Sequence, residues 1–139
     1  MSNQDAHDYR IVVGFDGSKG AIKALEWAAD EARRREASLA VVRAWTPGEY
    51  GTYEEMEQLV RDALPGEVSA ILPADPARSV ELVVRKGTPA KVLLHEARDA
   101  DMLVVGSRGH GGFTGLLLGS VSQQLVTHAG APVVVIVRD

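Results

Sequence analysis

The sequence contains no cysteine, which excludes disulfide bonds and thiolate metal ligands. Basic residues do not outnumber acidic ones, and the formal net charge of −4 argues against a general nucleic-acid-binding protein, which usually presents a basic face. No apolar run approaches the length that spans a bilayer, and the polar start of the chain lacks the apolar region of a signal peptide. We therefore expect a cytoplasmic protein without nucleic-acid or membrane partners.

Aromatic residues make up only 5% of the chain and are too scattered to form a base-stacking platform. We expect the tryptophans Trp27 and Trp45, and likewise Tyr50 and Tyr53, to serve as packing residues. The histidines lack partners at ligand spacing, so protein side chains alone predict no metal site.

What the chain does contain is a repeated pattern of short apolar runs rich in valine and isoleucine. The runs cover residues 11–15, 39–45, 80–86, 102–107 and 133–137. Most are apolar without strict alternation, which is typical of strands buried on both faces of a parallel sheet. The length of 139 residues fits one domain, with residues 1–8 as a loose tail.

Helical periodicity separates these runs. Ser18 is a candidate N-cap for a helix whose buried face is Ala21, Leu25, Ala28, Ala29 and Ala32. A second helix is predicted with Met56, Leu59, Val60 and Ala63 on one face, ending at Pro65-Gly66, and residues 65–79 give no clear prediction. Thr88 and Pro89 mark the start of a third helix, and Gly119-Ser120 the start of a fourth that ends at Gly130.

Strands and helices therefore alternate along the whole chain. This order predicts the α/β class, with an open five-stranded parallel sheet, right-handed crossovers and helices on both faces. Such a sheet binds ligands at the carboxyl ends of its strands, where the strand order reverses.

A glycine-rich segment, residues 106–120, follows the fourth strand and leads into the last helix. Glycine allows positive φ and lets backbone N–H groups approach a ligand, and a helix N-terminus adds unpaired N–H donors. The hydroxyls of Ser120 and Ser122 would add further donors. A flexible surface turn is the alternative, but the strand–loop–helix placement favours phosphate binding.

Two common phosphate motifs are missing. No lysine precedes Ser120 as a Walker sequence requires, and the turn after the first strand reads GFDGSKG, which does not fit the dinucleotide-binding fingerprint. Asp16 in that turn would repel a pyrophosphate at close range. It is expected either to contact a sugar or base, to reach phosphates through a divalent cation, or simply to cap the first helix.

These residues resemble the universal stress protein family and specifically its ATP-binding branch. The branch motif G-x2-G-x9-G-[ST] is matched by Gly106, Gly109 and Gly119-Ser120, and the opening IVVGFDGS is similar to the family's first strand. The resemblance extends from Arg10 to Arg138. It implies an adenine-nucleotide alpha-hydrolase-like fold with strand order 3-2-1-4-5.

The resemblance also implies a ligand, ATP with Mg, and a set of contacts. The adenosine part would meet Asp16, the backbone of Gly14 and Phe15, and the backbone of Ala44, while Val105 and Gly106 would flank the ribose. The phosphates would meet Gly109, Gly119, Ser120, Val121 and Ser122. Residues 46–79 depart from the family pattern by being short of regular helix, and this region could cover the nucleotide.

The resemblance implies a nucleotide-dependent regulatory or stress-response protein. No general base is evident, so efficient turnover is not expected, although slow ATP hydrolysis or adenylyl transfer is one alternative. The other is an interaction module without nucleotide. The uncharged strand 133–137 is an unprotected sheet edge, through which family members commonly dimerise, and predicts a homodimer.

Overall fold

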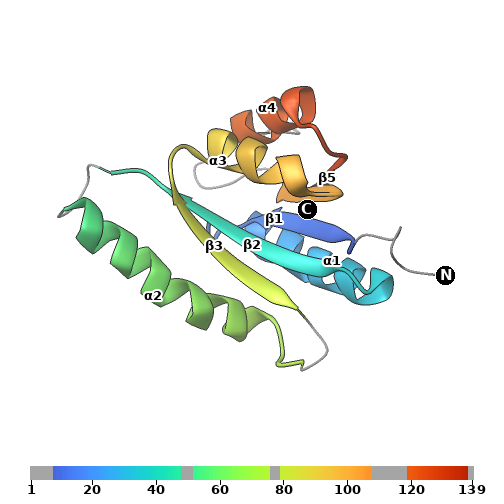
Figure 1. The fold of residues 1–139 in the computed structure, drawn as a ribbon, viewed down its shortest axis with the longest axis horizontal. Helices are drawn as coiled ribbons and strands as arrows, with labels where there is room; N and C mark the ends of the chain where they lie inside the picture. Colours follow the sequence, from blue (N-terminus) through green and yellow to red (C-terminus); the bar gives the residue numbers. More distant parts are fainter. Residues whose placement is uncertain (1–7, 48–51, 76–78, 108–118, 138–139) are drawn as a thin grey trace.

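The computed structural model describes residues 8–47, 52–75, 79–107 and 119–137. Within them the chain forms a five-stranded parallel sheet with four α-helices (Figure 1). In chain order the elements are β1 Arg10–Gly14, α1 Lys19–Arg35, β2 Ser38–Trp45, α2 Tyr53–Ile71, β3 Val80–Lys86, α3 Pro89–Glu96, the short 3-10 helix η2 Ala97–Asp99, β4 Met102–Gly106, α4 Ser120–His128 and β5 Val133–Ile136.

The strand order is β3-β2-β1-β4-β5, which confirms the predicted α/β sheet. All four strand pairs are parallel, and β1 lies between β2 and β4. The strands coincide with the five apolar runs to within about a residue at most ends, because side chains buried on both faces leave little room for polar residues.

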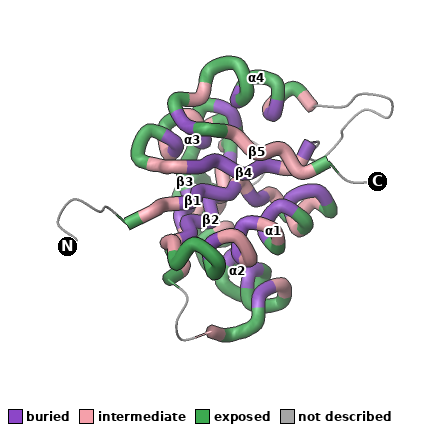
Figure 2. The backbone as a smooth tube through the Cα atoms, turned by 90° about the vertical axis from the view of Figure 1, so that its right-hand side faces the viewer, coloured by how far each residue is buried: buried purple, intermediate pink, exposed green. Residues whose placement is uncertain are grey.

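Helices cover both faces of the sheet, with buried residues concentrated in the middle layer (Figure 2). On one face α1 and α2 pack against alternating strand residues such as Ile11, Val13 and Val41. On the other face α3 and α4 pack against the intervening residues, such as Val12, Val42 and Val105. Two apolar cores therefore share one sheet.

The first helix matches its prediction. The Ser18 hydroxyl accepts a hydrogen bond from the Ala21 N–H at 3.2 Å, and the predicted alanine-rich face is buried. Thr88 and Pro89 also begin α3 as expected, although the Thr88 side chain forms no capping hydrogen bond.

The second helix corrects two predictions. α2 does not end at Pro65-Gly66 but continues to Ile71, and residues 46–79 are therefore not short of regular helix. Its buried residues are Leu64 and Val68, whereas Leu59 and Ala63, predicted for the inner face, are exposed. Burial of Val68, with Leu72 just beyond the helix, favours continued helix despite the proline, because packing outweighs local propensity.

Candidate functional site

The strand order reverses between β1 and β4, whose carboxyl ends lie next to each other in the sheet. β1 is followed by the turn into α1, and β4 is followed by the segment that leads to α4. This is the position at which an open parallel sheet binds ligands. Most of the predicted site residues fall on these elements.

At the end of β1, the Phe15 side chain belongs to the core, because only 4% of it is exposed. Its N–H donates to the Val42 carbonyl at 2.9 Å. Gly14 precedes it, and a Cβ atom at Gly14 would lie 2.8 Å from Cδ1 of Leu93. Both residues could therefore meet a ligand only through their backbone, as predicted.

Asp16 takes part in starting α1. Its Oδ1 accepts a hydrogen bond from the Ser18 N–H at 2.9 Å, and the residue is partly buried. This bond supports the capping alternative, since short carboxylates stabilise turns by bonding a backbone N–H two residues on. Contact between Asp16 and a sugar, a base or a cation stays a prediction.

At the end of β4, Val105 is buried and Gly106 brings the sheet close to α1. A Cβ atom at Gly106 would lie 2.8 Å from both the carbonyl carbon and the oxygen of Gly20, in the first turn of α1. The Gly106 position therefore requires glycine for close helix–strand packing. The sequence analysis did not identify Gly20, although its place just after the N-cap was a usable signal.

The start of α4 is also bonded to β4. Gly119 is the N-cap, and its N–H donates to the Ser107 carbonyl at 2.6 Å. Its φ of −77° is one that any residue adopts, so positive φ does not explain this glycine. The Ser122 hydroxyl is buried and donates to the Gly106 carbonyl at 2.6 Å. That hydroxyl thus links α4 to β4, which differs from its expected role as a phosphate donor.

The first-turn amides of α4 remain outside the helix's own hydrogen-bond ladder. That ladder begins with the Gln123 N–H, which donates to the Gly119 carbonyl at 3.0 Å. The backbone N–H groups of Ser120, Val121 and Ser122 come before it, as at any helix start. Ser120 is exposed and Val121 is partly buried. With α1 starting beside Gly106, two helix N-termini face the end of β4 and favour an anion there.

The two other predicted residues lie apart from this cluster or outside the description. Ala44 lies on β2 two residues beyond Val42, the register partner of Gly14, and is itself paired with Arg85. It therefore reaches the same carboxyl edge of the sheet. Gly109 lies outside the described residues. Ser107, which the sequence analysis passed over, provides the carbonyl that holds Gly119.

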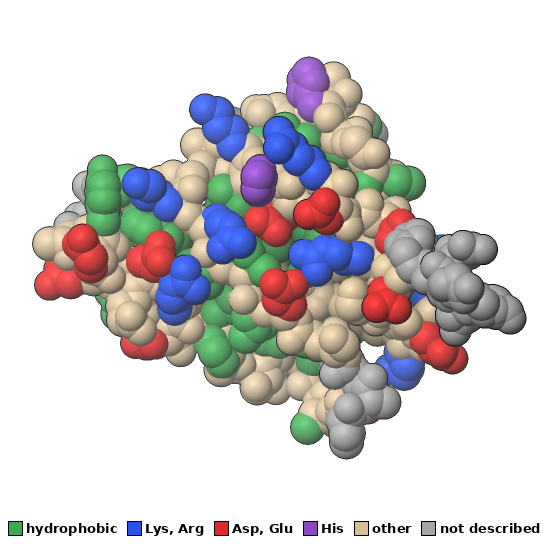
Figure 3. All heavy atoms as spheres, in the orientation of Figure 1, with side chains coloured by type: hydrophobic (Ala, Val, Ile, Leu, Met, Phe, Trp, Pro, Cys, Tyr) green, Lys and Arg blue, Asp and Glu red, His purple; other side chains and the backbone are tan. Residues whose placement is uncertain are grey.

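Charged side chains do not form a one-sign surface on the face in Figure 3, where basic and acidic groups are interspersed. In the part of the chain that the structure describes, no three acidic or histidine side chains cluster closely enough to hold a metal ion. Across the same residues, no helix combines the length and apolar character needed to cross a membrane.

Comparisons with known proteins agree on one family. The model of the universal stress protein family matches residues 9–137. A universal stress protein from Mycolicibacterium smegmatis is 39% identical over 141 residues, which cover 96% of this chain and 48% of that protein. The chain spans about half the length of the curated relatives it matches.

Solved structures share the fold. A universal stress protein in complex with cAMP superposes with a TM-score of 0.70 at 25% identity, covering 96% of this chain and all of that one (100%). A universal stress protein from Archaeoglobus fulgidus in complex with dAMP gives a TM-score of 0.67 at 28% identity, covering 92% and 97%. Both have adenine nucleotides bound, as their descriptions state. On sequence and fold together, the chain belongs to the universal stress protein family.

Proposed function

We propose that this chain binds ATP, with Mg, at the carboxyl ends of β1 and β4, and that nucleotide occupancy regulates its interactions in the cytoplasm. The observation that carries the proposal is the pair of helix N-termini at the end of β4, with the amides of Ser120 to Ser122 outside the helix ladder. Such amides suit phosphate oxygens. Relatives bound to cAMP and dAMP support adenine as the base.

The proposed contacts follow the chemistry of the residues. The phosphates would meet the amides of Ser120, Val121 and Ser122, together with Gly109 and Gly119. Adenosine would meet Asp16 and the backbone of Gly14, Phe15 and Ala44, and the ribose would pass Val105 and Gly106. Because Oδ1 of Asp16 already accepts the Ser18 N–H, any cation bridge to phosphate would use the carboxylate in addition to that bond.

Calorimetric titration with ATP and Mg tests this proposal, with Gly119→Ala compared against Gly130→Ala. A methyl at Gly119 would stand at the start of α4 among the proposed phosphate donors, and we expect affinity to fall at least about tenfold. Gly130 follows α4, and a Cβ atom there meets nothing within 4 Å. The control should bind ATP like the unaltered protein.

The outcomes separate the alternatives. Equal ATP affinity in both variants would place the nucleotide elsewhere, and no binding by the unaltered protein would leave an interaction module without nucleotide. Release of AMP and pyrophosphate, followed by mass spectrometry, would instead indicate an adenylyl-transferring enzyme. ADP and AMP titrated in parallel identify which nucleotide binds most tightly.

We further propose a homodimer centred on β5. This strand lies at the end of the sheet order, pairs with β4 on one side, and carries only apolar residues from Val133 to Ile136. Val137 beyond it is 63% exposed. An uncharged edge strand readily pairs with a second copy of itself across a two-fold axis.

A further inference from the structure

A hollow lies at the carboxyl ends of β2 and β3, beside the first turns of α2. Its volume is about 340 Å³, within the range of small-molecule sites. The residues that line it, here named the Trp45 hollow, are Trp45, Tyr53, Glu54, Glu57, Gln58, Arg61 and Lys86. None of the residues proposed to contact ATP is among them.

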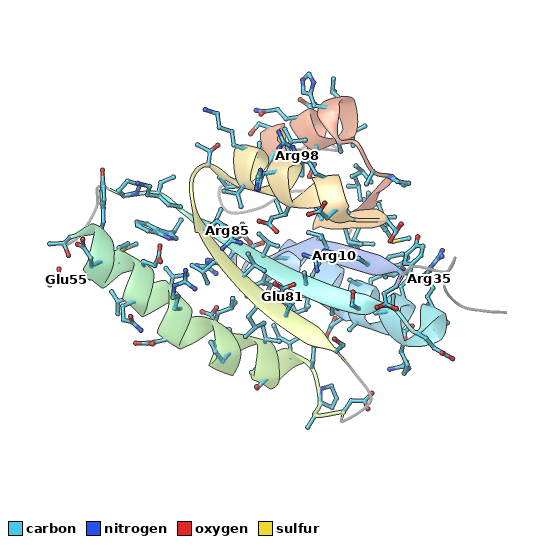
Figure 4. All side chains as sticks on the ribbon, in the orientation of Figure 1. Arg10, Arg35, Glu55, Glu81, Arg85 and Arg98 are labelled. Atoms are coloured by element: carbon cyan, nitrogen blue, oxygen red, sulfur yellow. The ribbon has the colours of Figure 1, made fainter. Side chains whose placement is uncertain are left out.

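The aromatic walls of the hollow are held in place by local structure. Trp45 and Tyr53 meet edge to face, with ring centroids 6.3 Å apart and planes at 70°. The Trp45 carbonyl accepts a hydrogen bond from the Gly87 N–H at 2.8 Å. On the other wall, Thr52 and Glu55 form a reciprocal capping box that fixes the start of α2, where Figure 4 labels Glu55.

The indole N–H of Trp45 has no partner among the described residues. Only 6% of Trp45 is exposed, and its Nε1 atom is buried. Buried indole N–H groups normally donate a hydrogen bond, because the group loses its bond to water without replacing it. Since Trp45 lines the hollow, a ligand there with an acceptor oxygen would satisfy this donor.

The charge in the hollow is also specific. Arg61 is paired with Glu57, through contacts of 2.9 and 3.1 Å. Lys86 instead places Nζ 4.6 Å from the centroid of the Tyr53 ring and forms no ion pair with any described residue. Lys86 and Trp45 are register partners on β3 and β2. One cation therefore lies on the same side of the sheet as the unpartnered indole.

Other surface cations near β3 are already neutralised. On the opposite face of the sheet, Arg10 pairs with Glu81 at 2.9 Å and Arg85 with Glu96 at 3.3 Å, and Figure 4 labels three of these residues. These pairs need no further anion. Lys86 differs from them because its described neighbour is an aromatic ring.

We propose that the Trp45 hollow is a second ligand site, which takes a small planar aromatic carboxylate. The ring packs against Trp45 and Tyr53, while the carboxylate accepts the Trp45 Nε1–H and neutralises Lys86. Glu54 and Glu57 on the rim disfavour ligands with several negative charges, such as polyphosphates. The site stands independently of the proposed ATP site.

Proton–nitrogen NMR of the two tryptophan indoles tests this proposal, with benzoate as the probe. A Trp27→Phe variant assigns the signals, because the chain contains two tryptophans. We expect the Trp45 indole signal to move downfield and saturate as benzoate is added, while the Trp27 signal stays in place. Benzyl alcohol, which has the ring without the charge, should produce a smaller shift at equal concentration.

A matched pair of lysine variants tests the charge. Lys86→Gln should weaken benzoate binding about two- to fivefold, the range of one partly exposed ion pair. Lys91→Gln removes an exposed charge from α3 and should bind benzoate as the unaltered protein does. The proposal is overturned if benzoate leaves the Trp45 signal unmoved or if both variants bind benzoate equally. It is also overturned if AMP saturates the same signal and competes with benzoate, since the hollow would then belong to the nucleotide site.

Discussion

At the end of β4, one missing side chain allows α1 to begin directly beside the sheet. A Gly106→Ala change would place a methyl 2.8 Å from two backbone atoms of Gly20, which have no flexible end that could move aside. We expect the free energy of unfolding to fall by about 1–3 kcal/mol, the range for overpacking. Urea denaturation of this variant and of Gly130→Ala measures the effect; matching midpoints in the two would contradict the expected clash.

The sequence predicted the site residues better than it predicted their bonding. A glycine-serine pair after a buried strand correctly indicates a helix start near the sheet edge, because a glycine-rich segment leading into a helix is readable from residue type. Which donors stay available depends on tertiary geometry. The Ser122 hydroxyl turns inward to the Gly106 carbonyl, and the Gly119 N–H is held by Ser107. No pattern in one sequence specifies these two bonds.

Among the elements, α2 carries a residue that weakens it without any packing role. Gly66 lies inside the exposed side of the helix, and a Cβ atom there would meet nothing within 4 Å. Gly66→Ala should raise the free energy of unfolding by about 0.5–1 kcal/mol, because alanine loses less backbone entropy on folding. Thermal unfolding measures the gain; a lower melting temperature would indicate that the helix needs glycine beside Pro65.

The boundaries of the elements were predictable to different degrees for a physical reason. Strands buried on both faces exclude polar residues, so the apolar runs predicted them closely. α2 packs on one side only, and Pro65-Gly66 gives a local stop signal that Val68 and Leu72 override by burial. Leu59, placed inside by periodicity, is 64% exposed because the helix presents Leu64 and Val68 to the sheet instead.

The edge strand β5 allows a test of the proposed dimer that spares the sheet. The Leu103 N–H bonds Pro132 O and the Ser107 N–H bonds Ile136 O, so even-numbered residues of β5 face β4. The Val135 backbone therefore points to the open edge. Val135→Pro removes a donor only there, and we expect a monomer by sedimentation at micromolar concentration with ATP binding retained.

A comparison variant distinguishes loss of the dimer from loss of the strand. Val134→Pro would remove an N–H that faces β4 and should lower stability as well as disrupt association. If Val135→Pro remains a dimer, or if the unaltered protein is itself a monomer, β5 is not the interface.

For the whole molecule, the two cores on either face of the sheet should act as one cooperative unit, since the same strands supply alternate residues to both. Ile11 belongs to the α1 face and Leu103 to the α4 face, and each has no exposed surface (0%). Ile11→Val and Leu103→Val each remove one methylene and should cost about 0.5–1.5 kcal/mol. Because the side chains pack in separate clusters, the double variant should lose the sum of the two within about 0.5 kcal/mol. Urea unfolding followed by both circular dichroism and tryptophan fluorescence should show one transition in every variant. A biphasic curve, or transitions that differ between the two probes, would mean that the faces unfold separately and that the sheet does not couple them.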